Sequence, residues 1–473
     1  MISLQPEGII SLRRVIEKTD YVFFMKQIRG IGDFMDPWPV FDLMKKAIEK
    51  LETPFRSTFL LLQLGISAEY DSLAAEIGTR DLEGIISTGI WKRNGSLVET
   101  DNLVVLSYQD INVLVEINPW FETCTNRNTD IYIGSDSLRL AECLPYHRGT
   151  RVLDLCSGSG IQGLLAARSA GRVISAEINP KTVPVTRFNV LLNDMQDRME
   201  VREGDLYHVL DEKDTFDYIY ANPPFIPMLD SIDYPICGAG GEDGLMVLRS
   251  ILAGLADRLK PGGKAVIFCE CLGDENGVFF DREVNDYMEK HNMRCTVSLR
   301  GRNLCDYQIV RLAELTELFN KDFDREEFER KMHEIYQRLG AKYLYDIIYK
   351  IESCREGSDS ENAEQGRMNY IRQYNQWDTD DRLERVPGYV FKRKGPVFDI
   401  FKDGSSFMRI NMEQAEELSY LSRGNTVRET ADWLYPRYKN AQAYKKYGKS
   451  SFVQAILDLC RLMEKSGVIR KIR

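Results

Sequence analysis

The sequence has few of the residues from which metal sites are built. Its 473 residues include four histidines, and its ten cysteines form no Cys-x-x-Cys pair. Cys269 and Cys271 are separated by one residue in an apolar run, and this spacing suits a buried strand better than zinc coordination. These absences argue against a structural metal and favour reduced thiols.

Long hydrophobic segments are also lacking. The longest apolar run, Phe59 to Leu64, is interrupted by Gln63 and is far shorter than the roughly 20 residues of a membrane-spanning helix. The N-terminus has no basic and then apolar succession typical of a signal peptide. We therefore expect a cytoplasmic protein without a membrane partner, and the residues do not fix its oligomeric state.

Length and charge predict more than one folded unit. With 43% apolar residues, the chain can form two or three cores. The whole chain has a net charge of −10, whereas residues 381–473 contain nineteen Lys and Arg against eleven Asp and Glu. The C-terminal part is thus locally basic in an otherwise acidic chain.

A glycine-rich turn follows an apolar strand near the middle of the chain. Residues 152–163 read Val-Leu-Asp-Leu-Cys-Ser-Gly-Ser-Gly-Ile-Gln-Gly, and a helix rich in Ala and Leu follows. Such a turn directs backbone N–H groups and the positive end of the helix at a ligand. Together with Glu177, the glycines also match the dinucleotide-binding pattern, so the turn alone fits a nicotinamide enzyme equally well.

Four successive apolar runs each contain or end in a polar residue. Asp154 lies inside the strand that precedes the glycines, and the next runs end at Glu177, Asp205 and Asn222. In an open α/β sheet, the carboxyl ends of the strands line the ligand crevice. We expect these side chains to form one site.

The tetrapeptide Asn222-Pro223-Pro224-Phe225 narrows the chemistry. An amide or aryl-amine nitrogen is a poor nucleophile because its lone pair is delocalised, and hydrogen bonds from its N–H groups to fixed acceptors localise that pair. Asn222 offers a side-chain carbonyl, and the two prolines fix the backbone so that a main-chain carbonyl can point the same way. Phe225 can stack on a planar acceptor. The segment therefore indicates transfer of a group onto a nitrogen atom of the acceptor molecule.

These motifs resemble the class I S-adenosylmethionine-dependent methyltransferases, and among them the small-domain group that includes the HemK-like glutamine methyltransferases and several RNA amino-group methyltransferases. The resemblance covers residues 126–315, and Gly240 to Leu245 is similar to a Gly-Gly-x-Asp-Gly-Leu segment of HemK-like enzymes. It implies a Rossmann-like seven-stranded α/β core and S-adenosyl-L-methionine as cofactor. HemK-like enzymes are shorter, which puts the release-factor glutamine in doubt as the substrate.

The resemblance also implies roles for individual residues. Asp154 with the Gly158 and Gly160 segment would hold the methionine part, and Glu177 the ribose hydroxyls. The full set that it assigns to the cofactor is Asp154, Ser157, Gly158, Gly160, Glu177, Ile178, Asp205, Leu206 and Asn222. The set that it assigns to the acceptor and to catalysis is Asn222, Pro223, Pro224 and Phe225.

Three neighbouring polar groups have simpler interpretations. Cys156 is expected to be a half-buried thiol rather than a nucleophile. His208 is expected to be a partly exposed polar residue rather than a general base. Ser135-Asp136-Ser137 is expected to cap a helix that begins near Leu138, although it could also cover the cofactor.

The N-terminal region, residues 1–125, is predicted to be a helical, winged-helix-like domain. Helices are expected over 41–51, 58–64, 69–77 and 81–88. A hairpin is expected at Asn94-Gly95, with a further strand over 103–106. Packing or protein docking explains such a module better than nucleic-acid binding, because Lys92 and Arg93 do not amount to a basic patch.

After the catalytic domain at 126–315, we predict a charged helix and linker at 316–380 and a basic winged-helix-like domain at 381–473. Segments 294–299 and 307–312 are expected to pair as the antiparallel hairpin that closes the sheet, and 314–352 to be largely helical. The C-terminal unit loosely resembles PqqD-like peptide-recognition domains. Its basic and aromatic cluster, suited to phosphates or an acidic peptide, comprises Lys445, Lys446 and Lys449 with Tyr438, Tyr444 and Tyr447.

Three functional hypotheses follow. The first is an N-methyltransferase of a peptide, protein or peptide-derived small molecule, with the flanking domains presenting the substrate. The second is the same chemistry on an exocyclic amine of RNA or DNA, which basic residues around the Asn222 pocket would favour and acidic ones would disfavour. The third is a non-catalytic binding module or a nicotinamide enzyme.

Overall fold

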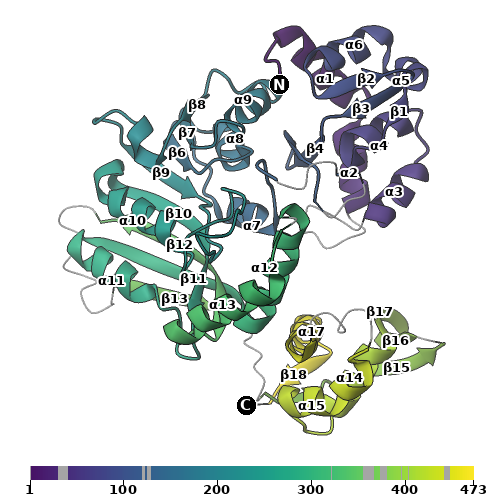
Figure 1. The fold of residues 1–473 in the computed structure, drawn as a ribbon, viewed down its shortest axis with the longest axis vertical. Coiled ribbons are helices and arrows are strands. Elements are labelled where there is room, and N and C mark those ends of the chain that lie inside the picture. Colours follow the sequence, from purple (N-terminus) through teal and green to yellow (C-terminus); the bar gives the residue numbers. More distant parts are fainter. Residues whose placement is uncertain are drawn as a thin grey trace.

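A computed structural model describes residues 2–29, 41–119, 123–124, 129–320, 322–354, 367–372, 381–395, 397–402, 404–440 and 448–472. It shows an N-terminal helical region, a large central sheet and a smaller C-terminal unit (Figure 1). Within the described residues, no helix combines the length and apolar character needed to cross a membrane. All ten cysteines are free thiols.

The central sheet has eight strands in the order β13-β11-β12-β10-β9-β6-β7-β8. Their bounds are β6 Arg151–Leu155, β7 Arg172–Glu177, β8 Met199–Glu203, β9 Phe216–Ala221, β10 Leu259–Gly273, β11 Met293–Leu304, β12 Tyr343–Ser353 and β13 Met368–Arg372. The strands from β8 to β10 run parallel, and β12 is antiparallel to both of its neighbours. This is the expected Rossmann-like α/β fold, with β12 in place of the expected strand at 307–312 and with β13 as an eighth strand.

Helices cover both faces of this sheet. Their bounds are α7 Ser135–Cys143, α8 Ile161–Ala167, α9 Val183–Leu192, α10 Met246–Arg258 and α11 Asp281–Lys290. On one face, Leu164 and Phe188 join a core with Phe268 of β10. On the other face, Ile251 and Met288 join a separate core. The buried, nearly continuous apolar strands reflect this double coverage.

The register of the parallel strands aligns their carboxyl ends. Leu155 of β6 pairs with Ala176 of β7 on one side and with Ala221 of β9 on the other. The glycine turn begins one residue beyond that row, and Glu177 and Asn222 each lie one residue beyond it. The sheet therefore brings together three of the four polar strand ends that the sequence predicted.

The expected closing hairpin was wrong in its second strand. Residues 307–312 lie in helix α12 (Cys305–Phe319), and the antiparallel partner of β11 is β12. Ile309, Leu312 and Thr316 are buried at helical spacing, which explains why this segment is not a strand.

The expected helical segment at 314–352 was also only partly correct. Helix α13 (Arg325–Leu339) ends at Gly340, whose φ of 70° is a left-handed cap, and β12 follows. Much of the predicted linker, 355–366 and 373–380, lies outside the described residues, but β13 between these segments joins the sheet beside β11. The boundary predicted at residue 315 therefore cuts through the sheet.

The four expected N-terminal helices, the hairpin and the strand over 103–106 are present, and α1, α2 and β5 are additional elements. Their bounds are α1 Pro6–Lys18, α2 Tyr21–Arg29, α3 Phe41–Glu49, α4 Arg56–Leu64, β1 Ala68–Glu69, α5 Tyr70–Ile77, α6 Thr79–Ser87, β2 Trp91–Asn94, β3 Leu97–Thr100, β4 Leu103–Tyr108 and β5 Ile111–Glu116. The predicted β2–β3 hairpin is confirmed, but its two-residue loop is Gly95-Ser96, because Asn94 still pairs with Leu97. Assignment of these elements to a winged-helix module stays a prediction.

Two asparagines of α9 dock the β4–β5 hairpin onto the central domain. The Asn189 side chain accepts a hydrogen bond from Leu114 N–H at 2.7 Å and donates to the Leu114 carbonyl at 3.1 Å. It also donates to the Ser159 carbonyl in the glycine turn at 2.9 Å. Asn193 bonds the Asn112 backbone in the same two-sided way. The N-terminal region is thereby held against the glycine turn.

The C-terminal unit has its own core, which includes Leu418, Leu434 and Ile456. Its elements are β14 Leu383–Arg385, β15 Tyr389–Lys394, β16 Val397–Lys402, β17 Ser405–Asn411, α14 Met412–Leu421, α15 Val427–Tyr438, α17 Gly448–Lys465 and β18 Ile469–Lys471. Helix α17 contacts α12, and Arg461 donates to the Arg302 carbonyl at 2.7 Å. In the predicted basic cluster, Lys445, Lys446, Tyr444 and Tyr447 lie outside the described residues.

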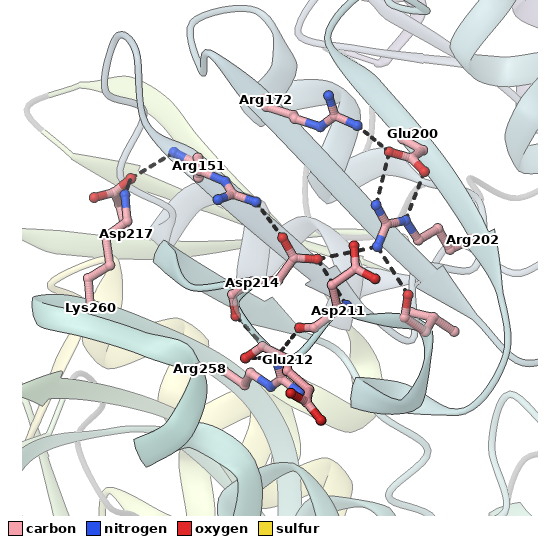
Figure 2. Close-up of polar contacts among 11 residues, drawn as sticks. Arg151, Arg172, Glu200, Arg202, Asp211, Glu212, Asp214, Asp217, Arg258 and Lys260 are labelled. Carbon is pink, nitrogen blue, oxygen red and sulfur yellow. Dashed lines mark hydrogen bonds and ion pairs between the residues drawn. The ribbon is translucent and has the colours of Figure 1, made fainter.

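An ion-pair network ties the opposite, amino-terminal edge of the sheet together (Figure 2). Asp214 accepts hydrogen bonds from Arg151 at 2.7 Å, from Arg202 at 3.4 Å and from the Asp211 N–H at 3.2 Å. Asp217 accepts one hydrogen bond from the Arg151 N–H and another from the Lys260 ammonium group, both at 2.8 Å. Arg151 and Asp217 lie at the amino-terminal ends of β6 and β9, away from the glycine turn, and the Arg202 side chain reaches Asp214 from β8. We therefore assign the network a structural role.

Asp214→Asn is expected to destabilise the fold. Burial opposes ionisation of Asp214, but the hydrogen bonds from Arg151 and the Asp211 N–H outweigh it and lower the pKa below its ordinary value. This contribution to stability is present above about pH 4 and is lost as the pH falls through the lowered pKa. At neutral pH we expect a loss of about 1 to 3 kcal/mol by chemical denaturation.

Asp110→Asn is the matched control, because Asp110 pairs with Lys26 at 2.6 Å on the exposed surface. Its expected cost is below about 0.5 kcal/mol. Equal effects of the two substitutions would contradict a special role for the network.

Candidate active site

The glycine turn between β6 and α8 has the backbone that its sequence predicts. Cys156, Gly158 and Gly160 have φ angles of 55°, 51° and 80°. A Cβ at Gly160 would lie 2.9 Å from Thr186 Cγ2, whereas a Cβ at Gly158 would meet nothing within 4 Å. Gly160 is thus required by packing and conformation, and Gly158 leaves open space above the turn into which a ligand can come close.

Glu177, the last residue of β7, holds the turn in place. One carboxylate oxygen accepts from the Gly158 N–H at 2.7 Å, and the other accepts from the Asn179 N–H at 2.8 Å. Burial raises the pKa of Glu177 even though these hydrogen bonds favour ionisation. Each carboxylate oxygen keeps a further lone pair for a ligand hydroxyl.

Asp154 is a buried carboxyl group within β6. It is 1% exposed, and Oδ2 accepts from the Gly163 N–H at 2.9 Å and from Ser175 Oγ at 3.3 Å. Burial raises its pKa to about 8, and the charge of nearby Glu177 adds to that rise. In the described part of the chain no cation pairs with Asp154, so this buried carboxyl group is suited to receive one from a ligand.

The remaining predicted cofactor residues lie around the same strand ends. Ser157 Oγ is buried without a hydrogen-bond partner among the described residues, which leaves it available to a ligand. Ile178 is 49% exposed directly after Glu177 and offers an apolar surface to a planar ring. Asp205 is exposed, and Leu206 has a left-handed φ of 42° at the end of the next strand connection. These residues fit a ligand with an ammonium group, a ribose and a planar base.

Asn222 follows β9 on the other side of the turn. Its Nδ2 donates to Asp136 Oδ2 at 2.6 Å and to Ser137 Oγ at 3.4 Å. Its Oδ1 is buried and has no hydrogen-bond partner in the described part of the chain. A buried acceptor without a donor is costly, and an incoming N–H group would remove that cost.

The rest of the tetrapeptide is packed around Asn222. Pro223 is buried, and Pro224 and Phe225 are partly buried. The Phe225 ring packs on Phe268 with centroids 5.5 Å apart. A Cβ at Gly244 would lie 2.3 Å from the Phe225 carbonyl oxygen, so the glycine-rich segment after the tetrapeptide must come close to it.

The expectation that Ser135-Asp136-Ser137 acts as a helix cap alone was wrong. Asp136 lies in the first turn of α7, yet its carboxylate accepts from Asn222 and, at 3.2 Å, from the Tyr132 hydroxyl. Ser137 Oγ is near both the Gly134 N–H, at 3.5 Å, and Asn222. The signal available from the sequence was an acid in a helix start close before the glycine turn, but its partner is a long-range contact.

Two further acids lie on the same face of the sheet and were missed by the sequence analysis. Glu270 of β10 pairs in register with Asp346 of β12. Burial raises the pKa of Glu270 to about 8, with added repulsion from Asp346 and Asp136. Asp346 is 6% exposed and forms an ion pair with Arg139 of α7. The surroundings of Asn222 are therefore rich in acceptors.

Two other polar groups near the turn offer no catalytic arrangement. Burial raises the pKa of the Cys156 thiol well above its ordinary value, which disfavours the thiolate. His208 is exposed and lies 3.6 Å from Asp205. Within the residues that the structure describes, no group of three or more His, Cys, Asp or Glu side chains is arranged to hold a metal ion.

Comparison with known proteins identifies this part of the chain. Residues 129–271 match the family model of the methyltransferase small domain, less than a third of the 473 residues. This part of the chain is therefore similar to the catalytic domain of S-adenosylmethionine-dependent methyltransferases, and it has the Rossmann-like sheet that the sequence predicted.

Curated relatives match the same region. A release factor glutamine methyltransferase from Clostridium acetobutylicum is 35% identical over 125 residues, 24% of this chain and 44% of the relative. A tRNA1(Val) (adenine(37)-N6)-methyltransferase from a Shewanella strain is 29% identical over 102 residues, 21% of this chain and 43% of the relative. The chain thus spans less than half of the length of each of these relatives.

Among solved structures, the tRNA m1G37 methyltransferase of M. jannaschii aligns with a TM-score of 0.31 and 13% identity. The alignment covers 57% of this chain and 64% of that protein. A score this low assigns no role to any residue of this chain.

Asp154→Asn is expected to stabilise the free protein and to weaken binding of S-adenosylmethionine. Because the pKa of Asp154 is raised to about 8, the folded protein retains a proton that the unfolded chain has lost above about pH 4. Stability therefore falls as the pH rises through this window. At pH 7 the variant should gain about 2 to 4 kcal/mol, while losing the carboxyl group that can release its proton and pair with a ligand cation.

The measurement is thermal unfolding between about pH 5 and pH 8, together with cofactor titration. A stability difference that does not change with pH would show that Asp154 is not a protonated, buried acid. Unchanged cofactor affinity would remove Asp154 from the cofactor site.

Proposed function

We propose that this protein is an S-adenosylmethionine-dependent N-methyltransferase that acts on an amide or amine nitrogen of a peptide, a protein or a peptide-derived small molecule. The observation that carries the proposal is the buried Oδ1 of Asn222 beside the glycine turn, which has no hydrogen-bond partner among the described residues. We assign the missing donor to the N–H of the methyl acceptor.

The chain's own residues position and polarise the acceptor. Asn222 Oδ1 and the Pro223 carbonyl accept its N–H hydrogens, which localises the nitrogen lone pair, and Phe225 packs against its plane. On the other side of the turn, Asp154 attracts the ammonium group and Glu177 accepts from the ribose hydroxyls. The cofactor supplies an electrophilic methyl group on a sulfonium, so no side-chain nucleophile is required.

The charge around Asn222 supports a peptide-type acceptor. Asp136 contacts Asn222 directly, whereas Glu270 has its pKa raised to about 8 and keeps its proton at neutral pH, and Asp346 is paired with Arg139. The carboxylate of Asp136 would repel a nucleic-acid phosphate next to the reacting nitrogen. It would accept hydrogen bonds from peptide N–H groups or from a cationic side chain.

Relatives support nitrogen as the acceptor atom. Their names include glutamine methyltransferases of release factors and of ribosomal protein uL3, and an adenine N6-methyltransferase of tRNA. Methylation of an exocyclic amine of RNA or DNA is therefore the second candidate. The basic C-terminal unit favours it, since residues 381–473 carry an excess of eight positive charges.

We assign substrate presentation to the flanking regions. The N-terminal region, residues 1–125, is attached to the glycine turn through Asn189. The C-terminal unit, residues 381–473, contacts the sheet through α17 and Arg461. Both are attached to the domain that contains the site, as substrate-presenting modules must be.

The test is transfer of label from methyl-labelled S-adenosylmethionine into an extract of cells that lack the gene, separated into protein, nucleic acid and small molecules. We expect label in the protein or small-molecule fraction. Label that is removed by nuclease would instead favour methylation of RNA or DNA. Binding of NAD without binding of S-adenosylmethionine would overturn the proposed chemistry.

Asn222→Ala is expected to lower transfer at least about 100-fold while changing cofactor affinity by less than about threefold, because Asn222 contacts the acceptor. Cofactor affinity is measured by calorimetric titration. An equal loss of turnover and cofactor affinity would show that Asn222 belongs to the cofactor site alone.

A further inference from the structure

We infer that Asp136 is a positioning residue that fixes the side-chain amide of Asn222 with its carbonyl oxygen toward the methyl acceptor. This inference rests on the proposed function and adds a residue that is separated from Asn222 by more than eighty positions in the sequence. The pair is joined by a hydrogen bond of 2.6 Å from Asn222 Nδ2 to Asp136 Oδ2.

The need for such a residue comes from the symmetry of an amide group. The oxygen and nitrogen ends of an asparagine side chain have nearly the same shape, and a half-turn about the last torsion exchanges them. Only the orientation with Oδ1 toward the acceptor can localise the nitrogen lone pair. The opposite orientation would present an N–H group to the acceptor's own N–H and repel it.

Asp136 selects between these orientations because a carboxylate only accepts hydrogen bonds. Oδ2 faces Asn222, and Oδ1 accepts from the Tyr132 hydroxyl at 3.2 Å. Ser137 Oγ gives a weaker second contact to Asn222 Nδ2 at 3.4 Å. Both ends of the Asp136 carboxylate are therefore used in holding their neighbours.

Asp136 can hold Asn222 only if helix α7 is itself fixed. At its start, the Ser137 carbonyl accepts from Gln162 Nε2 at 3.0 Å. Gln162 is in the first turn of α8, directly after the glycine turn, and is 4% exposed. Further along α7, Arg139 forms an ion pair with the buried Asp346 of β12. The helix is thus tied to the cofactor turn and to the sheet.

These contacts form a continuous connection from the cofactor turn to the acceptor site. It passes from Gln162 through the Ser137 backbone to Asp136 and Asn222. Its function is to set one orientation of Asn222 at a fixed position relative to the transferred methyl group. We therefore expect loss of Asp136 to lower turnover without lowering cofactor affinity.

The kinetic experiment compares Asp136→Ala with Asp136→Asn, using transfer of label from methyl-labelled S-adenosylmethionine to the extract fraction that the wild-type protein labels. Asp136→Ala should lower kcat about 10- to 100-fold and change the KM for cofactor by less than about twofold. Asp136→Asn should restore turnover to within about tenfold of wild type, because its carbonyl can accept from Asn222 Nδ2.

Glu142→Ala is the matched control, since Glu142 is an exposed acid on the same helix that lies 3.8 Å from Arg300. It should leave turnover within about twofold of wild type. In the Asn222→Ala background, Asp136→Ala should cause no further loss, because Asp136 acts through Asn222. Additive losses would overturn the inference.

A second readout does not depend on turnover. In protein labelled with ¹⁵N-asparagine, the side-chain NH₂ signals of Asn222, assigned by their loss in Asn222→Ala, should move in Asp136→Ala and stay unchanged in Glu142→Ala. Unmoved signals in Asp136→Ala would overturn the inference. If wild-type protein labels no fraction, the proposed function fails, and these signals still decide whether Asp136 holds Asn222.

Discussion

The site depends on one row of backbone pairing in the parallel sheet. Leu155 lies between Ala176 and Ala221 in this row, so the three strands end together. The residues that follow are the glycine turn, Glu177 and Asn222. A shift of one strand by a single residue would turn its side chain to the opposite face and separate the acceptor group from the cofactor turn. Burial of apolar residues on both faces of these strands fixes the register.

Groups at this edge are held in states that are unfavourable without a ligand. Asp154 retains its proton at neutral pH because it is buried, and Ser157 Oγ and Asn222 Oδ1 have no hydrogen-bond partners among the described residues. Each has a cost in stability that a bound ligand could offset. By contrast, the ion pairs at the amino-terminal edge, such as Arg151 with Asp214, are mutually satisfied. The carboxyl-terminal edge of the sheet thus carries the proposed site, and the amino-terminal edge carries ion pairs that stabilise the fold.

Local sequence patterns were sufficient where a short segment determines its own structure. The glycine turn, the hairpin at Asn94-Gly95 and the parallel strands were predictable from periodicity and turn chemistry. Residues 307–312 were misassigned because six apolar and polar residues fit both periods, and only the continuation to Thr316 identifies a helix. Asp136 was assigned to a cap because its partner, Asn222, is distant in sequence. Contacts of that kind follow from the packing of α7 on the sheet and have no local signal.

The most direct test of the account is a crystal structure with sinefungin, an analogue that carries an amine in place of the transferred methyl group. The account predicts its amino-acid part at the glycine turn near Asp154, its ribose on Glu177 and its amine directed toward Asn222 Oδ1. An analogue bound with that amine pointing away from Asn222, or bound at another place on the sheet, would contradict it.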